Sequence, residues 1–321
     1  MSDQAAMDIS LVIPLFNEDE SLRPLVTWIY KELESRDLSY QIVFVDDGSR
    51  DKSWSVIEEL NDEFPDLIKA LRFRRNYGKA AALSQGFKVA EGDVVITMDA
   101  DLQDSPEEIV PLFNMITKEG YDLVSGWKKK RHDPISKTLP SKLFNAVARY
   151  FSEIKLHDFN CGLKAYRQDV VRDITVYGDM HRWMPVLAKW QGYGKIGEKV
   201  VEHRAREFGV SKFGAKRLVS GFLDLLSLFF VGKFNKKPMH FFGSFGILSL
   251  MIGLFSLGYL SIRKLFYDVS GISERPLFFM GILALIIGAQ LFLTGFLAEL
   301  IIDSRGRQYD YNISEQLNIG D

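Results

Sequence analysis

Val94-Val95-Ile96-Thr97-Met98 is an apolar run that leads directly into Asp99-Ala100-Asp101-Leu102-Gln103-Asp104. In an open α/β sheet, ligands bind beyond the carboxyl ends of buried strands. Side chains two positions apart point the same way, so Asp99 and Asp101 are placed to share one cation. A hard divalent ion, Mg²⁺ or Mn²⁺, would let this acidic edge hold a nucleotide diphosphate. The alternative is a solvated acidic turn that caps a helix over Pro106–Lys118.

Short apolar runs alternate with helical patterns through the first part of the chain. The runs that predict strands are Ile9–Ile13, Gln41–Val45, Ile68–Phe73, Val94–Met98 and Leu123–Ser125. The helical patterns between them are Ser21–Ser35, Ser53–Asn61 and Lys79–Ala90. This alternation predicts an α/β fold with a parallel sheet that helices cover on both faces.

The last part of the chain is apolar. The 321 residues are 47% hydrophobic with a mean hydropathy of −0.03, which resembles a soluble protein. That average conceals two runs with almost no charge, Met239–Ile262 and Pro276–Ile302. Because a spanning helix needs about 20 apolar residues, each run predicts a transmembrane helix.

The predicted organisation has a cytosolic domain at residues 1–213 and a cytosolic tail at 303–321. Met1-Ser2-Asp3-Gln4 lacks the basic and apolar start of a signal peptide. We therefore expect a multi-pass protein of the inner (cytoplasmic) membrane with the folded domain and both termini in the cytoplasm. Two basic amphipathic segments, residues 135–151 and 214–232, are predicted to lie in the membrane interface, with a third crossing as the alternative for the second.

Several classes of site are disfavoured by composition. The net charge of −2 gives no indication of nucleic-acid binding. Cys161 is the single cysteine, which excludes an intrachain disulfide and a thiolate metal cluster. The five histidines show no zinc-binding spacing.

Three further strand ends carry polar or glycine-containing turns. They are Ile13-Pro14-Leu15-Phe16-Asn17-Glu18, Asp46-Asp47-Gly48-Ser49-Arg50-Asp51 and Asn76-Tyr77-Gly78-Lys79. Each alone is also explained as a helix cap or a tight turn. Together they would line one crevice with groups that hold a base, a ribose and phosphates.

With these motifs the chain resembles the family 2 glycosyltransferases of GT-A fold, and among them the bacterial two-span polyprenyl-phosphate and dolichyl-phosphate glycosyltransferases. Arg75–Lys79, Asp99–Asp104 with Pro106-Glu107, and Arg206–Lys212 also carry the resemblance, which covers nearly the whole chain. It implies a Rossmann-like, mostly parallel sheet and a metal site at Asp99, Asp101 and Gln103. The nucleotide-sugar contacts that it implies are Pro14, Phe16, Glu18, Asp46, Asp47, Lys79, Asp99, Ala100 and Asp101.

A lipid phosphate acceptor would need cations, because it is anionic and must approach an acidic site. The candidate contacts beside the amphipathic segments are Lys137, Ser141, Arg204, Arg206 and Lys212. Each alone is also explained as a surface residue. The resemblance implies acceptor-phosphate contacts at Lys137, Ser141 and Arg206, with lysine at 137 where relatives often have arginine.

Asp158 and Asp101 are the candidate catalytic residues. Asp158 lies in His157-Asp158-Phe159-Asn160-Cys161-Gly162 and matches an aspartate that the family holds near the sugar and the acceptor. It would orient the acceptor, act as a base or bind a sugar hydroxyl. The alternative is a loop cap.

The resemblance implies an inverting, metal-dependent transfer of one sugar from a nucleotide sugar to polyprenyl (undecaprenyl) phosphate, for cell-envelope glycan modification or glycosylation. UDP-glucose is the first candidate donor, and a dolichyl-phosphate-mannose-type synthase that uses GDP-mannose is the alternative. A processive polysaccharide synthase is disfavoured by the two spans and the absence of a Gln-x-x-Arg-Trp motif, and a non-catalytic scaffold by the intact aspartate pair. Further expected partners are a second copy of the chain, a flippase and a downstream glycosyltransferase.

Overall fold

The computed structural model describes residues 7–129, 145–146, 148–150, 152–176, 180–204, 238–267 and 271–304. The chain divides into two compact units, Met1–Asp224 and Leu225–Asp321.

The first unit is built on a seven-stranded sheet with the order β3-β2-β1-β4-β6-β5-β7. The strands are β1 (Ile9–Leu15), β2 (Tyr40–Asp46), β3 (Ile68–Arg72), β4 (Val94–Thr97), β5 (Leu123–Trp127), β6 (Lys164–Arg167) and β7 (Ile196–Val200). β1 pairs in parallel with β2 and β4, and β2 pairs in parallel with β3. β6 runs antiparallel to both β4 and β5, while β7 is parallel to β5. The sheet is therefore mostly parallel.

All five strands predicted from apolar runs are present, and the mostly parallel sheet is confirmed, although the antiparallel strand β6 and the edge strand β7 were not predicted. β6 escaped prediction because its four residues begin with Lys164 and end with Arg167. Lys164, Ala165 and Tyr166 are nevertheless buried between β4 and β5. β7 also lacks an apolar run, since its side chains are half-buried or exposed.

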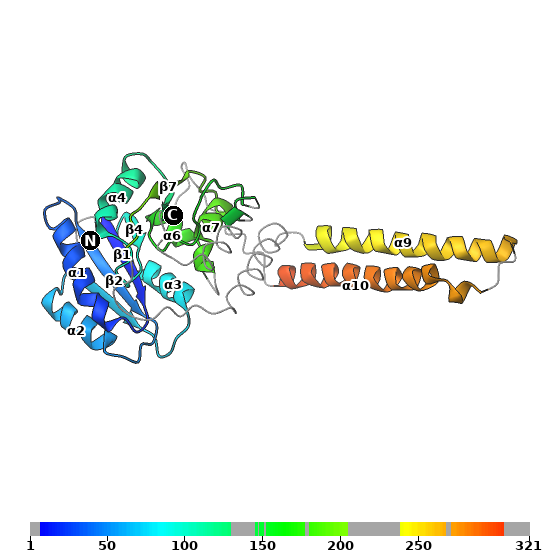
Figure 1. Ribbon diagram of the computed structural model, residues 1–321, viewed down its shortest axis with the longest axis horizontal. Helices are drawn as coiled ribbons and strands as arrows, with labels where there is room; N and C mark the ends of the chain where they lie inside the picture. Colours follow the sequence, from blue (N-terminus) through cyan, green and yellow to red (C-terminus); the bar gives the residue numbers. More distant parts are fainter. Residues whose placement is uncertain are drawn as a thin grey trace, which may run out of the picture. The chain divides into compact units, whose positions relative to one another are not determined.

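Helices cover both faces of the sheet, as the sequence predicts (Figure 1). They are α1 (Asp19–Leu33), α2 (Ser53–Glu63), α3 (Lys79–Val89), α4 (Ile109–Thr117), α6 (Gln168–Asp173) and α7 (Met184–Trp190), with short 3₁₀ turns η1 (Pro106–Glu108) and η2 (Met180–Arg182). Leu11 and Ile13 of β1 join the core cluster that contains α1, α2 and α4. Val12 between them joins the cluster that contains α3, α6 and α7. Because successive side chains of a strand point to opposite faces of the sheet, β1 contributes residues to both hydrophobic cores.

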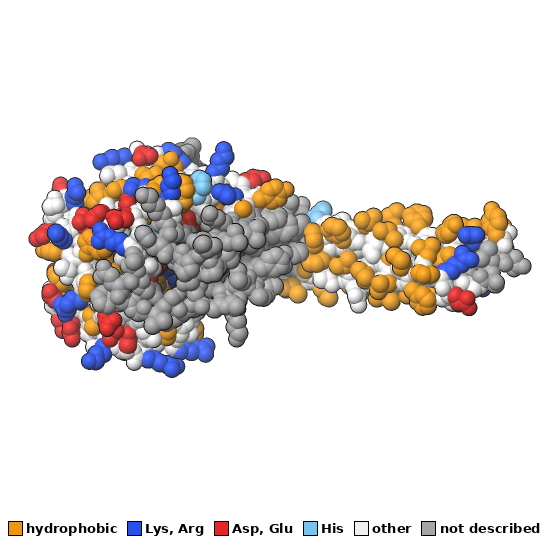
Figure 2. Space-filling view, in the orientation of Figure 1, with side chains coloured by type: hydrophobic (Ala, Val, Ile, Leu, Met, Phe, Trp, Pro, Cys, Tyr) orange, Lys and Arg blue, Asp and Glu red, His pale blue; other side chains and the backbone are white. Residues whose placement is uncertain are grey.

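The second unit contains two long apolar helices, α9 (Pro238–Tyr267) and α10 (Pro276–Ser304), and a short turn η3 (Ile272–Glu274). Within Pro238–Tyr267 and Pro276–Ile301, 18-residue stretches have mean hydropathies of 2.0 and 2.3, and both helices are long enough to cross a membrane. Figure 2 shows that hydrophobic side chains dominate their visible surface. Residues 214–232, most of 135–151 and nearly all of 303–321 lie outside the described residues, so the interfacial helices and the tail stay predictions.

Glycines let α9 and α10 approach each other closely. A Cβ atom on Gly246 would lie 2.8 Å from the Phe292 nitrogen, and one on Gly288 would lie 2.8 Å from the Leu250 nitrogen. Further along α9, a Cβ atom on Gly253 would lie 2.8 Å from the carbonyl oxygen of Gly281 on α10. In lipid, where no hydrophobic force brings helices together, such close backbone packing supplies the attraction.

Gly288→Leu should therefore destabilise the helical pair by about 1–3 kcal/mol, because the side chain collides with the α9 backbone. Thermal loss of helical circular dichroism of the full-length protein in detergent measures the effect. Gly258→Leu is the matched control, since nothing lies within 4 Å of a Cβ at that position. Equal destabilisation by both variants would contradict the role of the glycine contacts.

Candidate functional site

The three predicted turns at the ends of β1, β2 and β3 are linked by hydrogen bonds. Asp47 accepts bonds from the backbone nitrogens of Tyr77 at 2.7 Å and Gly78 at 2.9 Å. The Asn17 nitrogen donates to Ser49 Oγ at 2.9 Å, and Asn17 Oδ1 in turn accepts a bond from the next loop residue, Arg50. The strand ends therefore form one continuous rim, as the parallel arrangement of β1, β2 and β3 requires.

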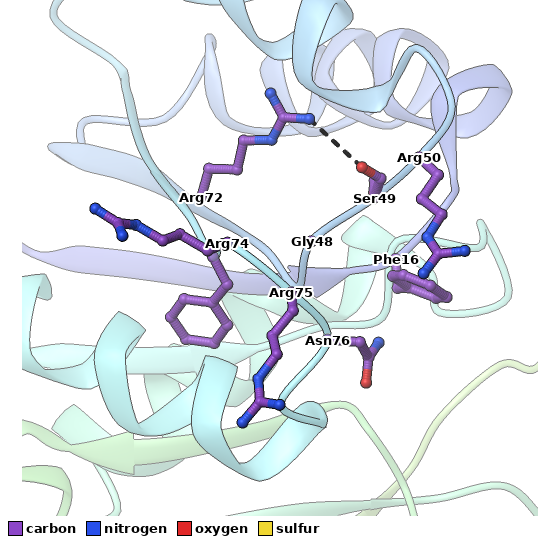
Figure 3. Close-up of a pocket in the computed structure, with 9 residues that line it drawn as sticks. Phe16, Gly48, Ser49, Arg50, Arg72, Arg74, Arg75 and Asn76 are labelled. Carbon is purple, nitrogen blue, oxygen red and sulfur yellow. Dashed lines mark hydrogen bonds between the residues drawn. The ribbon is translucent and has the colours of Figure 1, made fainter.

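A hollow of about 440 Å³ opens at this rim (Figure 3). Its lining residues are Phe16, Gly48, Ser49, Arg50, Arg72, Phe73, Arg74, Arg75 and Asn76. Of the predicted nucleotide contacts, only Phe16 lines it. The arginines were not among the predicted site residues, although Arg72-Phe73-Arg74-Arg75 directly follows an apolar run. None of the described residues that line the hollow is acidic, so it favours a ligand rich in hydrogen-bond acceptors or negative charge.

Two of these arginines have partners that hold them at the rim. Arg72 forms an ion pair with the fully buried Asp46 at 3.4 Å and lies over the Trp54 ring. The Arg75 guanidinium lies 4.8 Å from the centre of the Tyr77 ring. Asp46 therefore supports the wall of the hollow through Arg72, and its direct contact to a nucleotide stays a prediction.

Pro14 and Glu18 also occupy structural positions at this edge. Pro14 lies inside β1, where it pairs with Val45 of β2. Glu18 precedes α1, and its backbone nitrogen donates to Ser53 Oγ at 2.9 Å. Their roles as nucleotide contacts stay predictions.

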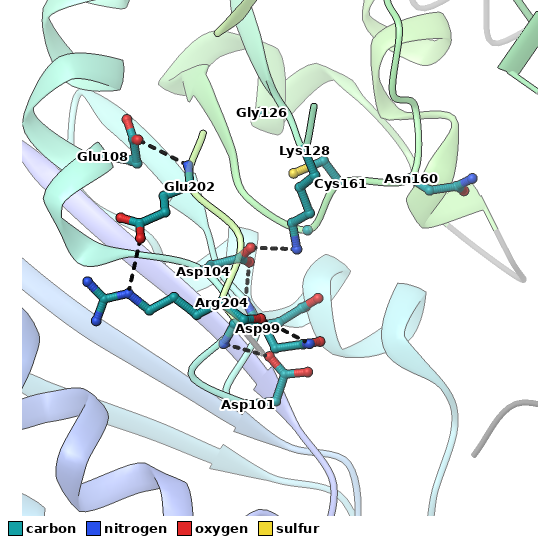
Figure 4. A network of polar contacts seen from close by, with 12 residues as sticks. Asp99, Asp101, Asp104, Glu108, Gly126, Lys128, Asn160, Cys161, Glu202 and Arg204 are labelled. Carbon is teal, nitrogen blue, oxygen red and sulfur yellow. Dashed lines mark hydrogen bonds and ion pairs between the residues drawn. The ribbon is translucent and has the colours of Figure 1, made fainter. Parts of the chain in front are cut away.

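The acidic loop after β4 turns tightly so that its carboxylates gather (Figure 4). Leu102 has a φ of 59°, a left-handed conformation that reverses the chain after Asp101. Asp101 Oδ1 accepts a bond from the Gln103 nitrogen at 3.3 Å, and Ala100 is buried beside it. The Asp99 backbone nitrogen donates a hydrogen bond of 3.4 Å to Asp104 Oδ2. The structure thus brings the three predicted metal ligands, Asp99, Asp101 and Gln103, into one loop.

Three lysines surround this loop. Lys79 at the start of α3 contacts Asp99, and Lys128 pairs with the buried Asp104 at 2.7 Å. Lys164 of β6 is 3% exposed and donates to the carbonyl oxygen of Cys161. Sequence reasoning selected only Lys79, since Lys128 and Lys164 belong to no motif and only the fold brings them here.

These lysines set the charge state of the loop. Burial alone would raise the pKa of Asp99, but the charges of Lys79, Lys128 and Lys164 hold this pKa at about 2. Burial would lower the pKa of Lys128, and the facing Asp104 carboxylate raises it well above its ordinary value. Burial lowers the pKa of Lys164. Asp99 is therefore ionised at neutral pH.

The donor set fits Mg²⁺ or Mn²⁺. Two carboxylates and an amide oxygen are hard ligands, and these ions also keep substrate phosphates and waters in their coordination shell. Within the described ranges no group of three or more histidine, cysteine, aspartate or glutamate side chains is placed to hold a metal ion. The space beside Asp99 is kept open by Gly162, where a Cβ atom would lie 2.4 Å from Asp99 Oδ2. A bound cation would supply positive charge to a departing diphosphate.

Asp158 lies on the loop that precedes β6 and is 1% exposed. Its Oδ1 accepts a bond from the Asn160 nitrogen at 3.0 Å, and its carbonyl oxygen accepts one from Ser125 Oγ at 3.2 Å. The local cap that the sequence allows is therefore present. The catalytic role of Asp158 stays a prediction, as does that of Asp101.

Of the five predicted acceptor-phosphate residues, the structure describes Arg204; the others, Lys137, Ser141, Arg206 and Lys212, lie outside the described residues. The Arg204 guanidinium lies 4.3 Å from the centre of the Trp28 ring and 3.7 Å from carboxylate oxygens of Glu107 and Glu202. Its backbone exchanges bonds with Gln103: the Arg204 nitrogen donates to the Gln103 carbonyl at 3.1 Å, and Gln103 Nε2 donates to the Arg204 carbonyl at 3.4 Å. Arg204 thereby supports the acidic loop, and its contact to an acceptor phosphate stays a prediction.

Lys128→Met should destabilise the protein by about 3–5 kcal/mol, because it leaves the Asp104 carboxylate buried without its cation. The double variant Lys128→Met with Asp104→Asn should recover most of that loss, since no unpaired charge remains. Thermal unfolding measures both, with the exposed Lys118→Met as the control. If the double variant is no more stable than Lys128→Met alone, the loss of stability does not arise from the unpaired Asp104 charge.

Gly162→Ala should weaken the binding of Mn²⁺ with a nucleoside diphosphate by about tenfold, since the added methyl group displaces the Asp99 carboxylate at a cost of about 1–3 kcal/mol. Isothermal titration calorimetry on the full-length protein measures the affinity. Gly194→Ala is the control, because nothing lies within 4 Å of a Cβ there. Unchanged affinity in Gly162→Ala would show that the close approach to Asp99 has no effect on the site.

Solved structures show the fold to which this site belongs. A crystal structure of glucosyl-3-phosphoglycerate synthase from Mycobacterium tuberculosis covers 70% of this chain and 80% of its own, with a TM-score of 0.53 and 18% identity. Another structure of that synthase, which holds Mn²⁺, UDP-glucose and phosphoglyceric acid, has a TM-score of 0.51. These likenesses confirm the GT-A fold.

Sequence comparisons extend over nearly the whole chain. A dodecaprenyl-phosphate galacturonate synthase of Rhizobium johnstonii is 35% identical over 298 residues, 92% of this chain and 88% of the relative. An undecaprenyl-phosphate 4-deoxy-4-formamido-L-arabinose transferase of Pseudomonas syringae is 31% identical over 302 residues, 94% of this chain and 86% of the relative. The family model described as glycosyl transferase family 2 matches residues 10–175. The chain therefore belongs to glycosyl transferase family 2.

Proposed function

We propose that this enzyme transfers a single sugar from a nucleotide sugar to a polyprenyl phosphate. The observation that carries the proposal is a continuous line of contacts from the hollow to the acidic loop. Asp47 binds the backbone of Tyr77 and Gly78, and the next residue, Lys79, contacts Asp99. A donor that lies along this line has its nucleoside in the arginine-lined hollow and its diphosphate at Asp99 and Asp101.

The chemistry follows from the charge of the two substrates. An acceptor phosphate oxygen attacks the anomeric carbon, and the bond from that carbon to the nucleotide diphosphate breaks. The acceptor oxygen is already anionic, so the attack needs no strong base. Asp99, Asp101 and Gln103 would hold the cation, and Asp158 would orient the sugar or the acceptor. Direct displacement inverts the anomeric configuration.

A polyprenyl phosphate acceptor is supported by two findings. The relatives named above are, by their names, a dodecaprenyl-phosphate galacturonate synthase and an undecaprenyl-phosphate formamido-arabinose transferase. The chain also has two helices long and apolar enough to cross a membrane. The proposed location is the bacterial inner membrane, with the catalytic unit and both termini on the cytoplasmic side, and Lys137, Ser141, Arg206 and Lys212 as the proposed headgroup contacts.

The donor is proposed to be a uridine nucleotide, with UDP-glucose as the first candidate. UDP-galacturonate is the second, because the relative with 35% identity is named a galacturonate synthase. The arginines of the hollow suit the acceptor oxygens of a uracil ring. Guanine also presents hydrogen-bond acceptor atoms, so GDP-mannose should be included among the donors that are assayed.

The purified full-length protein, supplied with undecaprenyl phosphate, Mn²⁺ or Mg²⁺ and labelled nucleotide sugars, should form a lipid with one sugar. Asp101→Asn should lower kcat by about 10²–10³-fold, because the charge that holds the cation at the leaving diphosphate is lost. A chelator should abolish transfer. Lys118→Met is the control. If no donor supports transfer, the proposed enzymatic activity is refuted. Lipids that carry more than one sugar would favour a processive synthase. A product that retains the anomeric configuration of the donor would refute direct displacement.

A further inference from the structure

Lys79 differs from the other two lysines around the acidic loop. The Lys79 and Asp99 side chains remain 33% and 35% exposed although they contact each other. Lys128 is 12% exposed and is held by Asp104, and Lys164 is 3% exposed and is held by the Cys161 carbonyl. Of the three, only Lys79 can therefore leave its partner without creating a buried unpaired charge.

The contact between Lys79 and Asp99 conflicts with a cation at the same carboxylate. Lys79 Nζ donates a hydrogen bond to Asp99 Oδ1, one of the oxygens proposed to bind Mg²⁺ or Mn²⁺. A divalent cation within about 4 Å of an ammonium repels it strongly in a partly buried site, where water screens the charges poorly. One of the two must move, and the flexible four-carbon stem of lysine makes Lys79 the one that does.

The position of Lys79 also determines where its charge can go. Lys79 is the first residue of α3, and Gly78 before it has a φ of 95° that turns the chain into the helix. Because Lys79 is partly exposed beside the acidic loop, an incoming diphosphate meets its ammonium group there.

We propose that Lys79 is a resident counter-ion of the cation site. It neutralises Asp99 while no donor is bound, gives up this carboxylate when the divalent cation enters with the nucleotide diphosphate, and then pairs with the diphosphate. This proposal rests on the proposed function, since it takes the donor to be a nucleotide sugar. Its consequence is that cation and nucleotide bind cooperatively, each strengthening the other by the same factor.

Mn²⁺ binding tests the exchange without relying on turnover. Electron paramagnetic resonance of free Mn²⁺ gives the affinity of the full-length protein in detergent, with and without UDP, after subtraction of the Mn²⁺ that UDP binds alone. The wild type should bind Mn²⁺ weakly and gain about tenfold or more with UDP. Lys79→Met should bind Mn²⁺ about tenfold more tightly without UDP, because Asp99 is no longer neutralised, and should gain less from UDP.

Matched variants separate the exchange from general effects of charge. Lys79→Arg keeps the cation and should retain the wild-type pattern, and Lys79→Gln is a second uncharged variant in case Lys79→Met fails to fold. Lys88→Met removes an exposed lysine from the same helix and should change nothing.

Two outcomes would overturn the proposal in different ways. Unchanged or weaker Mn²⁺ binding by nucleotide-free Lys79→Met and Lys79→Gln would refute the counter-ion, while cooperative binding and sugar transfer by the wild type would still support the proposed function. A wild type that neither transfers sugar nor binds Mn²⁺ more tightly with UDP would refute both.

Discussion

The structure of the catalytic unit depends on the neutralisation of carboxylates that crowd one end of the sheet. Asp101, Asp104 and Asp158 are each at most 9% exposed, and Asp99 lies among them. Charges in such a place are costly unless cations and hydrogen bonds compensate them. Lys128, directly after β5, and Lys164, on β6, supply permanent compensation, whereas Lys79 supplies it from a partly exposed helix terminus. The arrangement leaves one acidic position open to exchange.

The antiparallel strand β6 is what completes the site. It inserts between β4 and β5 and brings the loop that contains Asp158 and Gly162 next to the end of β4. Thr97 Oγ1 donates to the Gly162 carbonyl at 2.7 Å, which fixes this loop beside Asp99. Gly162 of this loop therefore lies beside Asp99 because the chain returns through the middle of the sheet in the opposite direction.

The two apolar helices follow a different rule. Their surfaces are hydrophobic and exposed, so apolar burial between them cannot account for their association in lipid. Gly246 and Gly253 on α9 face Gly288 and Gly281 on α10, and Ser249 Oγ donates to the Ala284 carbonyl at 2.7 Å. Close packing and a short polar contact hold them together. The α/β unit and the pair of apolar helices thus use separate physical interactions within one chain.

The sequence by itself determined the alternation of strands and helices, the two apolar helices, the family resemblance and the acidic loop, because each depends on residues that are close in the chain. Periodicity and length identify elements, and turn residues mark where strands end. Only the tertiary structure decided the antiparallel β6, the arginine-lined hollow, and the lysines that face the carboxylates. Lys128 and Lys164 lie 24 and 60 positions beyond Asp104, and no local pattern relates them to it. Their roles depend on charge compensation across the sheet, which exists only once the strands have been assembled.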